Sequence, residues 1–167
     1  DGAQRRMFLS RDRIGVRPLF YTQLGGKLSF ASEIKALLTQ PEVKAEIDVD
    51  ALDEIFTFWT TIGSRSFFRG IQQLPPGHNM VVTESGLRVT RYWSLSYNPD
   101  SRAEAERRGE ASYLEELEAL LSDAVRIRLR SDVPVGAYLS GGLDSSITVA
   151  AIRTFTKSPL KTFSVTF

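Results

Sequence analysis

The sequence predicts two folds in succession, an α+β part followed by the start of an α/β domain with a parallel sheet. Short apolar strands around turn residues fill the chain up to about residue 92. After a charged stretch, helical periodicity leads into an apolar run that ends at small residues before another helix. This strand–loop–helix succession is typical of parallel sheets, because neighbouring parallel strands need a crossover that is usually helical.

Hairpins are expected to form most of the first part. Gly25-Gly26 is a turn signal between two strand-like runs, and Glu84-Ser85-Gly86 lies between two more. A short helix from Glu33 to Leu38 ends before Pro41. The strands are expected at residues 7–9, 19–22, 27–31, 78–83 and 87–92.

A longer helix is predicted over residues 48–60. It carries an apolar stripe at positions i, i+3, i+4 and i+7, opened by Asp48 or Asp50 as the capping residue. Such a stripe predicts core packing for its aromatic members rather than base stacking. Its residues are Leu52, Ile55, Phe56 and Trp59.

Two groups of polar residues have a structural interpretation. The alternating charges of Arg11, Asp12, Arg13 and Arg17 favour local ion pairs and turn hydrogen bonds over a phosphate or RNA patch, since no series of aromatic residues accompanies them. His78 is the only histidine and the chain has no cysteine, so a transition-metal site is not expected there.

The composition changes at Asn98-Pro99-Asp100. Six of the ten residues 101–110 are charged with mixed sign, which indicates a solvated linker or an exposed helix start. From Tyr113 the helical period returns and leads through Pro134 towards a buried strand. The apolar positions of this helix are Leu114, Leu117, Leu121, Ala124, Val125 and Leu129.

The stretch from Val135 to Ile147 predicts an anion site. An apolar run ends in Ser140-Gly141-Gly142, and a helix then begins whose first N–H groups have no intrahelical partner. Glycine lets the backbone approach a ligand closely, and Ser145 and Ser146 add hydroxyl donors. A phosphate or pyrophosphate suits such a junction. The chain has no Gly-Lys-Ser/Thr ending, so this is not the phosphate loop of kinases and GTPases.

Asp144 has two interpretations. A carboxylate repels a phosphate unless a cation lies between them, so we interpret Asp144 as a magnesium ligand. The alternative is a plain turn in which Asp144 or Ser145 caps the following helix.

Several motifs resemble known families. Residues 140–146, SGGLDSS, resemble the pyrophosphate loop of the N-type ATP pyrophosphatases, ligases that cleave ATP to AMP and pyrophosphate. Residues 10–21 and 26–38 resemble the late part of a glutamine-hydrolysing amidotransferase domain. Residues 68–78 and Arg91-Tyr92-Trp93 are similar to the close of that domain in asparagine synthetases of the glutamine-using type. The order of the motifs resembles that family over nearly the whole chain.

The resemblance implies a division into domains. Residues 1–93 would be the C-terminal part of a glutaminase domain of the Ntn-hydrolase fold, and residues 94–112 a linker. Residues 113–167 would begin an ATP-pyrophosphatase synthetase domain with a parallel sheet. The implied activity converts aspartate, glutamine or ammonia, and ATP to asparagine through β-aspartyl-AMP, and a homodimer is a family expectation.

The resemblance also implies the site. ATP and Mg²⁺ would be bound at the loop, with Asp144 as the magnesium ligand, and Leu139 and Val165 match the family positions that contact adenosine. The residues carried over are Leu139, Ser140, Gly141, Gly142, Leu143, Asp144, Ser145, Ser146 and Val165.

The cysteine count bears on the glutaminase reaction. In the family the nucleophile is an N-terminal cysteine, and this chain has none and begins at Asp1. Its end, Thr162 to Phe167, reads as a strand with nothing after it. We therefore expect an internal fragment that is inactive by itself, with unpaired apolar surfaces and with the acceptor pocket beyond Phe167.

Composition excludes little else. The net charge of +1 gives no reason to expect nucleic acid, and no apolar run approaches the roughly 20 residues that span a bilayer. A cytoplasmic protein is expected. Two alternatives stay open: a related ligase that forms an amide or a β-lactam from another carboxylate, and a non-catalytic binding or regulatory module.

Overall fold

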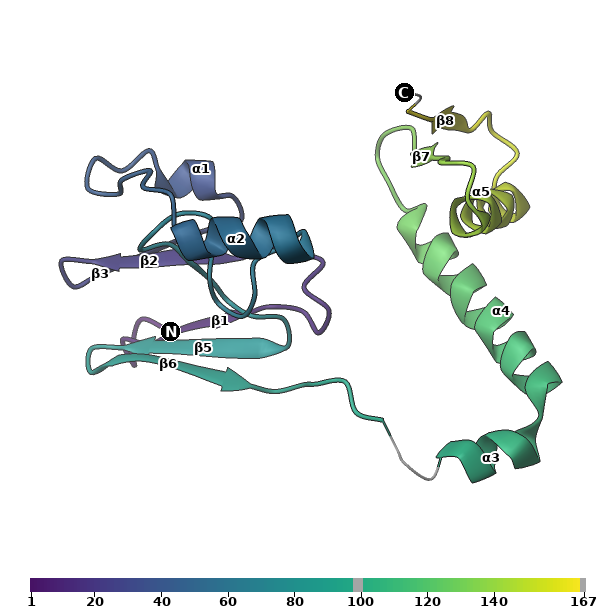
Figure 1. Cartoon of the computed structure of the whole chain (residues 1–167), viewed down its shortest axis with the longest axis horizontal. Coiled ribbons are helices and arrows are strands. Elements are labelled where there is room, and N and C mark those ends of the chain that lie inside the picture. Colours follow the sequence, from purple (N-terminus) through teal and green to yellow (C-terminus); the bar gives the residue numbers. More distant parts are fainter. Residues whose placement is uncertain (98–100, 166–167) are drawn as a thin grey trace. The chain divides into compact units, whose positions relative to one another are not determined.

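The computed structural model describes residues 1–97 and 101–165 and divides the chain into two compact units, Asp1–Ser96 and Tyr97–Phe167 (Figure 1). The predicted composition change at Asn98-Pro99-Asp100 lies outside the described residues. No helix in the described ranges is long and apolar enough to cross a membrane.

The first unit contains two antiparallel sheets of three strands each. One sheet has the order β1-β5-β6, from Met7–Ser10, His78–Thr83 and Gly86–Arg91. The other has the order β3-β2-β4, from Lys27–Ala31, Phe20–Leu24 and Gln72–Gln73. Both predicted hairpins are confirmed, since β2 pairs with β3 and β5 pairs with β6. Gly25 and Gly26 make the first turn with φ of 55° and 76°, values that glycine adopts without strain.

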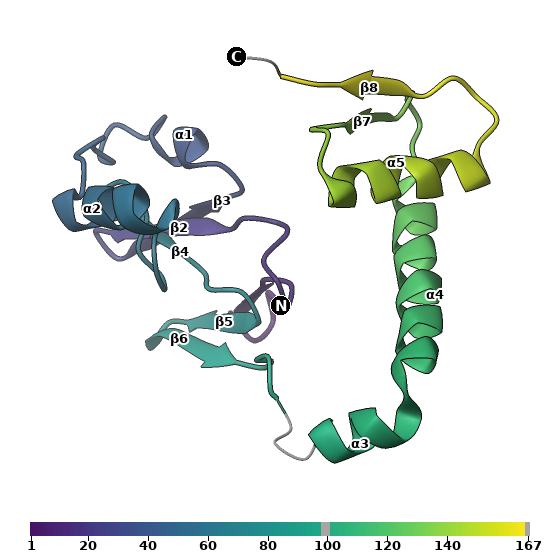
Figure 2. The same ribbon diagram turned by 45° about the vertical axis from the view of Figure 1, so that its right-hand side comes forward.

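The two sheets lie in layers (Figure 2), and buried side chains from both form a shared core. Leu9 of β1 and Met80 of β5 meet Tyr21 of β2, together with Leu74, which follows β4 and is fully buried. A second core lies between β2–β3 and the short helix α1, Ile34–Leu37, where Leu37, Val43 and Ile71 are buried. Most of the apolar burial in this unit therefore depends on strands that are distant in sequence.

Helix α2, Val49–Phe58, confirms the predicted helix and its cap, because the Asp48 side chain accepts hydrogen bonds from the N–H groups of Asp50 and Ala51. The predicted core role of Phe56 and Trp59 is wrong: these side chains are 81% and 93% exposed. Ala51 is the buried residue of the helix instead. Trp59 lies beyond the last helical residue with φ of 63°, so it does not continue the stripe.

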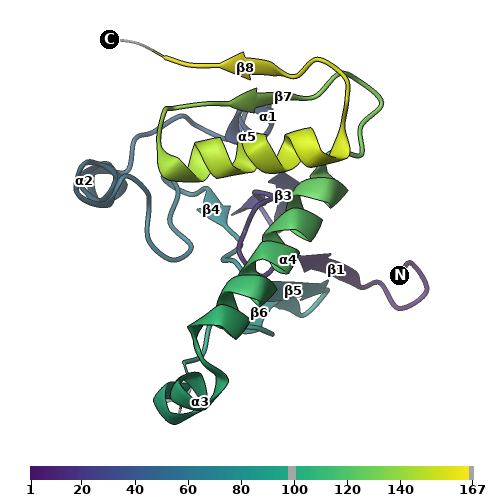
Figure 3. The same ribbon diagram turned by 90° about the vertical axis from the view of Figure 1, so that its right-hand side faces the viewer.

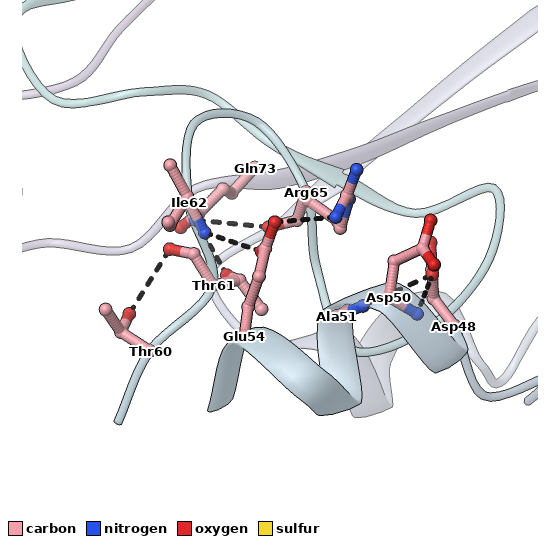
Figure 4. Close-up of polar contacts among 9 residues, drawn as sticks. All are labelled: Asp48, Asp50, Ala51, Glu54, Thr60, Thr61, Ile62, Arg65 and Gln73. Carbon is pink, nitrogen blue, oxygen red and sulfur yellow. Dashed lines mark hydrogen bonds and ion pairs between the residues drawn. The ribbon is translucent and has the colours of Figure 1, made fainter. Parts of the chain in front are cut away.

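A half-buried ion pair fixes the loop after α2 (Figure 4). Glu54 accepts a hydrogen bond from Arg65 at 2.6 Å and another from the Ile62 N–H at 2.9 Å. Gln73 donates to the Thr61 hydroxyl and to the Arg65 carbonyl, at 3.2 Å each. Because Glu54 belongs to α2 and Gln73 to β4, these bonds tie the loop to both elements.

Turn hydrogen bonds account for the charged loop between β1 and β2, as predicted. Asp12 accepts from the N–H groups of Val16 and Arg17, at 2.8 and 3.0 Å. The guanidinium of Arg11 donates to the carbonyls of Arg17, Gly15 and Leu74, at 3.2, 3.2 and 2.7 Å. Burial lowers the pKa of Arg11. His78 is the first residue of β5 rather than part of a loop, and its Nδ1 lies 2.8 Å from the Pro76 carbonyl.

The Asp12 turn should make stability depend on pH. Hydrogen bonds from the N–H groups of Arg17 and then Val16 lower the pKa of Asp12. A carboxyl whose pKa is lower in the folded state stabilises the fold above the range where the unfolded group titrates, about pH 4, and the effect is lost as the pH falls through the folded value. Asp12→Asn should lower the thermal midpoint at neutral pH, and the difference from wild type should shrink below about pH 4. An equal difference at neutral and acidic pH would contradict this account.

In the second unit, the described residues form three helices and one parallel strand pair. Helix α3, Ser101–Arg108, lies within the predicted linker, and α4, Glu110–Arg128, follows it. Strand β7, Gly136–Tyr138, and strand β8, Lys161–Phe163, pair in parallel and are joined through α5, Leu143–Phe155. Helices α4 and α5 pack together (Figure 3). Val125 of α4 and Ile152 of α5 are the buried residues of these helices.

The strand predicted before the loop forms as β7, but the prediction that it is buried is wrong. Tyr138 of β7 is 85% exposed, and Val133 and Phe163 are also exposed. The physical reason is that the described pair has only two strands, so part of its surface has no covering layer. Unpaired apolar surface was expected, and it is present here. The predicted final strand is shorter than expected: β8 ends at Phe163, and residues 166–167 lie outside the described residues.

Candidate functional site

The predicted anion site lies where β7 passes into α5. Strand β7 ends at Tyr138, and the loop from Leu139 to Gly142 leads into the helix at Leu143. Gly142 is the N-cap residue, and no side chain caps the helix. The alternative in which Asp144 or Ser145 caps α5 is therefore wrong, because both residues lie inside its first turn. The first N–H groups of α5 are then available to a ligand.

The two glycines leave room at the loop. Gly141 has φ of 84°, a left-handed conformation that strains other residues, and a Cβ placed there would meet nothing within 4 Å. A Cβ at Gly142 would meet the Ser140 hydroxyl at 3.5 Å. The backbone of this loop is thus open to a group that approaches the helix start.

Three serine hydroxyls organise the loop from within. Ser140 Oγ accepts a hydrogen bond from the Gly142 N–H at 3.4 Å and lies 3.1 Å from Ser145 Oγ. Ser145 and Ser146 both donate to the Gly142 carbonyl, at 3.0 and 2.9 Å. The partners of these hydroxyls all lie in the same loop and helix turn. Each hydroxyl could therefore turn toward a ligand oxygen without breaking a contact to another part of the fold.

Asp144 is exposed in the first turn of α5. Within residues 1–97 and 101–165 no group of three or more His, Cys, Asp and Glu side chains is arranged to hold a metal ion. The Asp144 carboxylate by itself offers oxygen ligands that a cation could use. This suits Mg²⁺, which usually binds through one or two carboxylates together with substrate phosphates.

Leu139 and Val165 belong to neighbouring segments that follow the two parallel strands. The Leu139 N–H donates to the Phe163 carbonyl at 2.9 Å, and Ser164 Oγ donates to the Leu139 carbonyl at 2.5 Å. Leu139 is half-buried and Val165 is 76% exposed. Sequence reasoning missed Ser164, whose only signal was a hydroxyl residue directly after a strand-like run.

A cavity of about 520 Å³ in the first unit is a weaker candidate for ligand binding. Its charged lining residues already have partners, because Asp48 caps α2 and Arg65 pairs with Glu54. The hydroxyl of Thr22, also in the lining, donates to the Gly70 carbonyl at 2.7 Å. The loop at the start of α5 is therefore the stronger candidate for ligand binding.

Comparison with known proteins agrees with the order of the motifs. The glutamine amidotransferase domain family matches residues 1–93, and the asparagine synthase family matches residues 116–167. These two matches define the class, a glutamine amidotransferase domain followed in the same chain by an asparagine synthase segment.

Individual relatives match along nearly the whole chain. Asparagine synthetase (glutamine-hydrolysing) 3 of Bacillus subtilis strain 168 is 38% identical over 100% of this chain and 27% of its own length. Asparagine synthetase (glutamine-hydrolysing) 2 of the same organism is 37% identical over 99% of this chain and 23% of its own length. Amidase chyE of Penicillium rubens is 37% identical over 87% of this chain and 21% of its own length.

The chain belongs to the glutamine amidotransferase domain family, which matches more than half of it. It is also similar over nearly its whole length to glutamine-hydrolysing asparagine synthetases. It spans about a quarter of the length of the curated relatives that it matches.

Proposed function

We propose that this chain is part of an ATP-dependent asparagine synthetase that hydrolyses glutamine. The reaction would convert aspartate, glutamine, ATP and water to asparagine, glutamate, AMP and pyrophosphate. One observation carries the proposal: the loop from Ser140 to Gly142 opens the first turn of α5 beside a parallel strand pair, in a chain whose relatives are named asparagine synthetases. Ligands of α/β sheets bind at the carboxyl ends of the strands, where this loop lies.

The two parts of the chain would divide the reaction. Residues 1–93 would form the end of the glutaminase domain, which supplies ammonia, and residues 94–112 would link it to the synthetase domain. Residues 113–167 would begin an ATP-pyrophosphatase domain with a parallel sheet. The matched family ranges and the two compact units support this division.

The loop would bind the phosphates of ATP. The first N–H groups of α5 and the hydroxyls of Ser145 and Ser146 would donate to phosphate oxygens, and the helix dipole favours the negative charge that grows on the departing pyrophosphate. Leu143 is the first residue of α5. Leu139 and Val165 would contact the adenosine. Attaching AMP to the aspartate carboxylate converts a poor leaving group into one that ammonia can displace.

Mg²⁺ would offset the negative charge of the phosphates when it is bound. Asp144 is the residue that would hold it, since this carboxylate is exposed in the first turn of α5. Without a cation the same carboxylate would oppose phosphate binding by charge repulsion. We also propose a cytoplasmic location and a homodimer. Both of these proposals rest on the likeness to the family.

A second candidate acts on another carboxylate. The similarity to Amidase chyE of Penicillium rubens supports it, because that relative is similar over 87% of this chain and is named an amidase rather than an asparagine synthetase. The two candidates would differ in the pocket that binds the carboxylate substrate. A non-catalytic module is the third candidate, and the intact loop with both glycines and Asp144 argues against it.

The test uses the full-length protein that contains this chain. AMP and pyrophosphate release would be measured with Mg·ATP and ammonium, with aspartate and with other carboxylates in turn. Release that requires aspartate supports the synthetase. Release with a different acid only would assign the protein to the amide-forming relatives, and no release with any acid would favour the non-catalytic module.

Residues 1–167 by themselves should be inactive in both half-reactions. The family's glutaminase uses a cysteine nucleophile and this chain has no cysteine, while the strand pair supplies only part of a nucleotide site. Glutamate release from glutamine and aspartate-dependent AMP release should both equal the rate without protein. Aspartate-dependent AMP production by this chain alone would refute the prediction.

A further inference from the structure

The Leu139 backbone is held on both sides by the segment that ends β8. Its N–H donates to the Phe163 carbonyl at 2.9 Å, and its carbonyl accepts from the Ser164 hydroxyl at 2.5 Å. In a regular parallel ladder such a carbonyl accepts from a main-chain N–H of the neighbouring strand. Here a side chain makes this bond, at the point where β7 passes into the loop.

The position of this bond matters for the loop. The Leu139 carbonyl directly precedes Ser140, so the bond fixes the direction in which the chain leaves the sheet. Ser140 in turn contacts the Gly142 N–H and the Ser145 hydroxyl. A displacement of Leu139 would therefore reach the N-terminal turn of α5 through two successive hydrogen-bonded contacts.

We propose that Ser164 is a positioning residue for the nucleotide, a role that rests on the proposed function of the loop. Its hydroxyl holds Leu139 so that the N-terminal turn of α5 faces the phosphates. It also keeps Val165, the next residue, close to Leu139, so that both can border the adenosine. Ser164 itself contacts the loop backbone, not the reacting atoms.

The experiment compares three variants of the full-length protein by isothermal titration with Mg·ATP. Ser164→Ala removes the hydroxyl, and Ser164→Thr retains it. Thr154→Val is the matched control, because the Thr154 hydroxyl donates to the Ala151 carbonyl at 2.7 Å within α5 and away from the loop. Thermal unfolding of each variant checks that it is folded.

Ser164→Ala should raise the dissociation constant for Mg·ATP about two- to tenfold, the usual range for one hydrogen bond. Ser164→Thr should stay within about twofold of wild type, and Thr154→Val should not change binding. In steady-state assays Ser164→Ala should raise the KM for ATP and leave the KM for aspartate unchanged. A merely structural role would lower the active fraction, and so kcat, without raising the KM for ATP.

Three results would overturn the inference: unchanged binding in Ser164→Ala, an equal loss in Ser164→Ala and Ser164→Thr, or an equal loss in Thr154→Val. The proposed function is tested separately. A wild-type protein that binds Mg·ATP but releases no AMP with any carboxylate would refute the proposed function, while the binding comparison would still decide the role of Ser164. Wild-type protein that does not bind Mg·ATP would refute both.

Discussion

Replacing Asp144 by alanine should lower aspartate-dependent AMP release by the full-length protein by about 10² or more, the usual effect of losing one preorganised electrostatic contact. The carboxylate is exposed in the first turn of α5, so its loss should leave the fold intact. The expected physical reason is the loss of the ligand that we propose for a cation, which would offset charge on the pyrophosphate. ATP binding should persist, because the helix N–H groups and the loop are unchanged.

Two comparisons make this test specific to the metal. Asp144→Asn retains one oxygen without the charge, so its rate should lie between those of wild type and Asp144→Ala, with a higher Mg²⁺ concentration needed for half-maximal activity. Glu118→Ala removes a carboxylate from the exposed face of α4 and should leave activity unchanged. A folded, ATP-binding Asp144→Ala protein with wild-type turnover would rule out the magnesium role.

Leu74→Ala should destabilise the first unit by about 2–5 kcal/mol, the range measured for buried leucines in other proteins. Leu74 is fully buried and packs with Leu9, Tyr21 and Met80, which come from both sheets. Removing its side chain leaves a cavity between layers that cannot close without moving strands. Urea unfolding, with hydrogen exchange of β1, β2 and β5 as the local readout, measures the loss.

Phe56→Ala is the matched control for this prediction. Its side chain is 81% exposed on α2, so the free energy of unfolding should change by no more than about 0.5 kcal/mol. A loss as large as that of Leu74→Ala would mean that another part of the full-length protein covers Phe56. A loss below about 1 kcal/mol in Leu74→Ala would contradict the layered core.

Local rules were sufficient for most elements. The turn residues at Gly25-Gly26 and Glu84-Ser85-Gly86 predicted both hairpins, and Asp48 predicted the start of α2. The loop from Ser140 to Gly142 lies between a strand and a helix, as expected. Each of these features depends on residues within a few positions of one another, so the backbone preferences of the residues decide it.

Burial was decided by contacts that are distant in sequence. Periodicity assigned Phe56 and Trp59 to the core, but a stripe does not specify which surface covers it, and Ala51 lies on the buried side of α2. Leu74 stood in no periodic pattern and proved fully buried, because two sheets meet around it.

The same division holds at the site. The residue types and spacing of 140–146 were enough to predict a loop followed by a helix with Asp144 in its first turn, since these features are local. Binding of an anion there stays a prediction. The hydrogen bond from Ser164 to Leu139 joins residues 25 positions apart and forms only because β7 and β8 pair in parallel. Tertiary structure therefore decided which side chain holds the loop in place, because strand pairing brings together residues whose proximity no local pattern encodes.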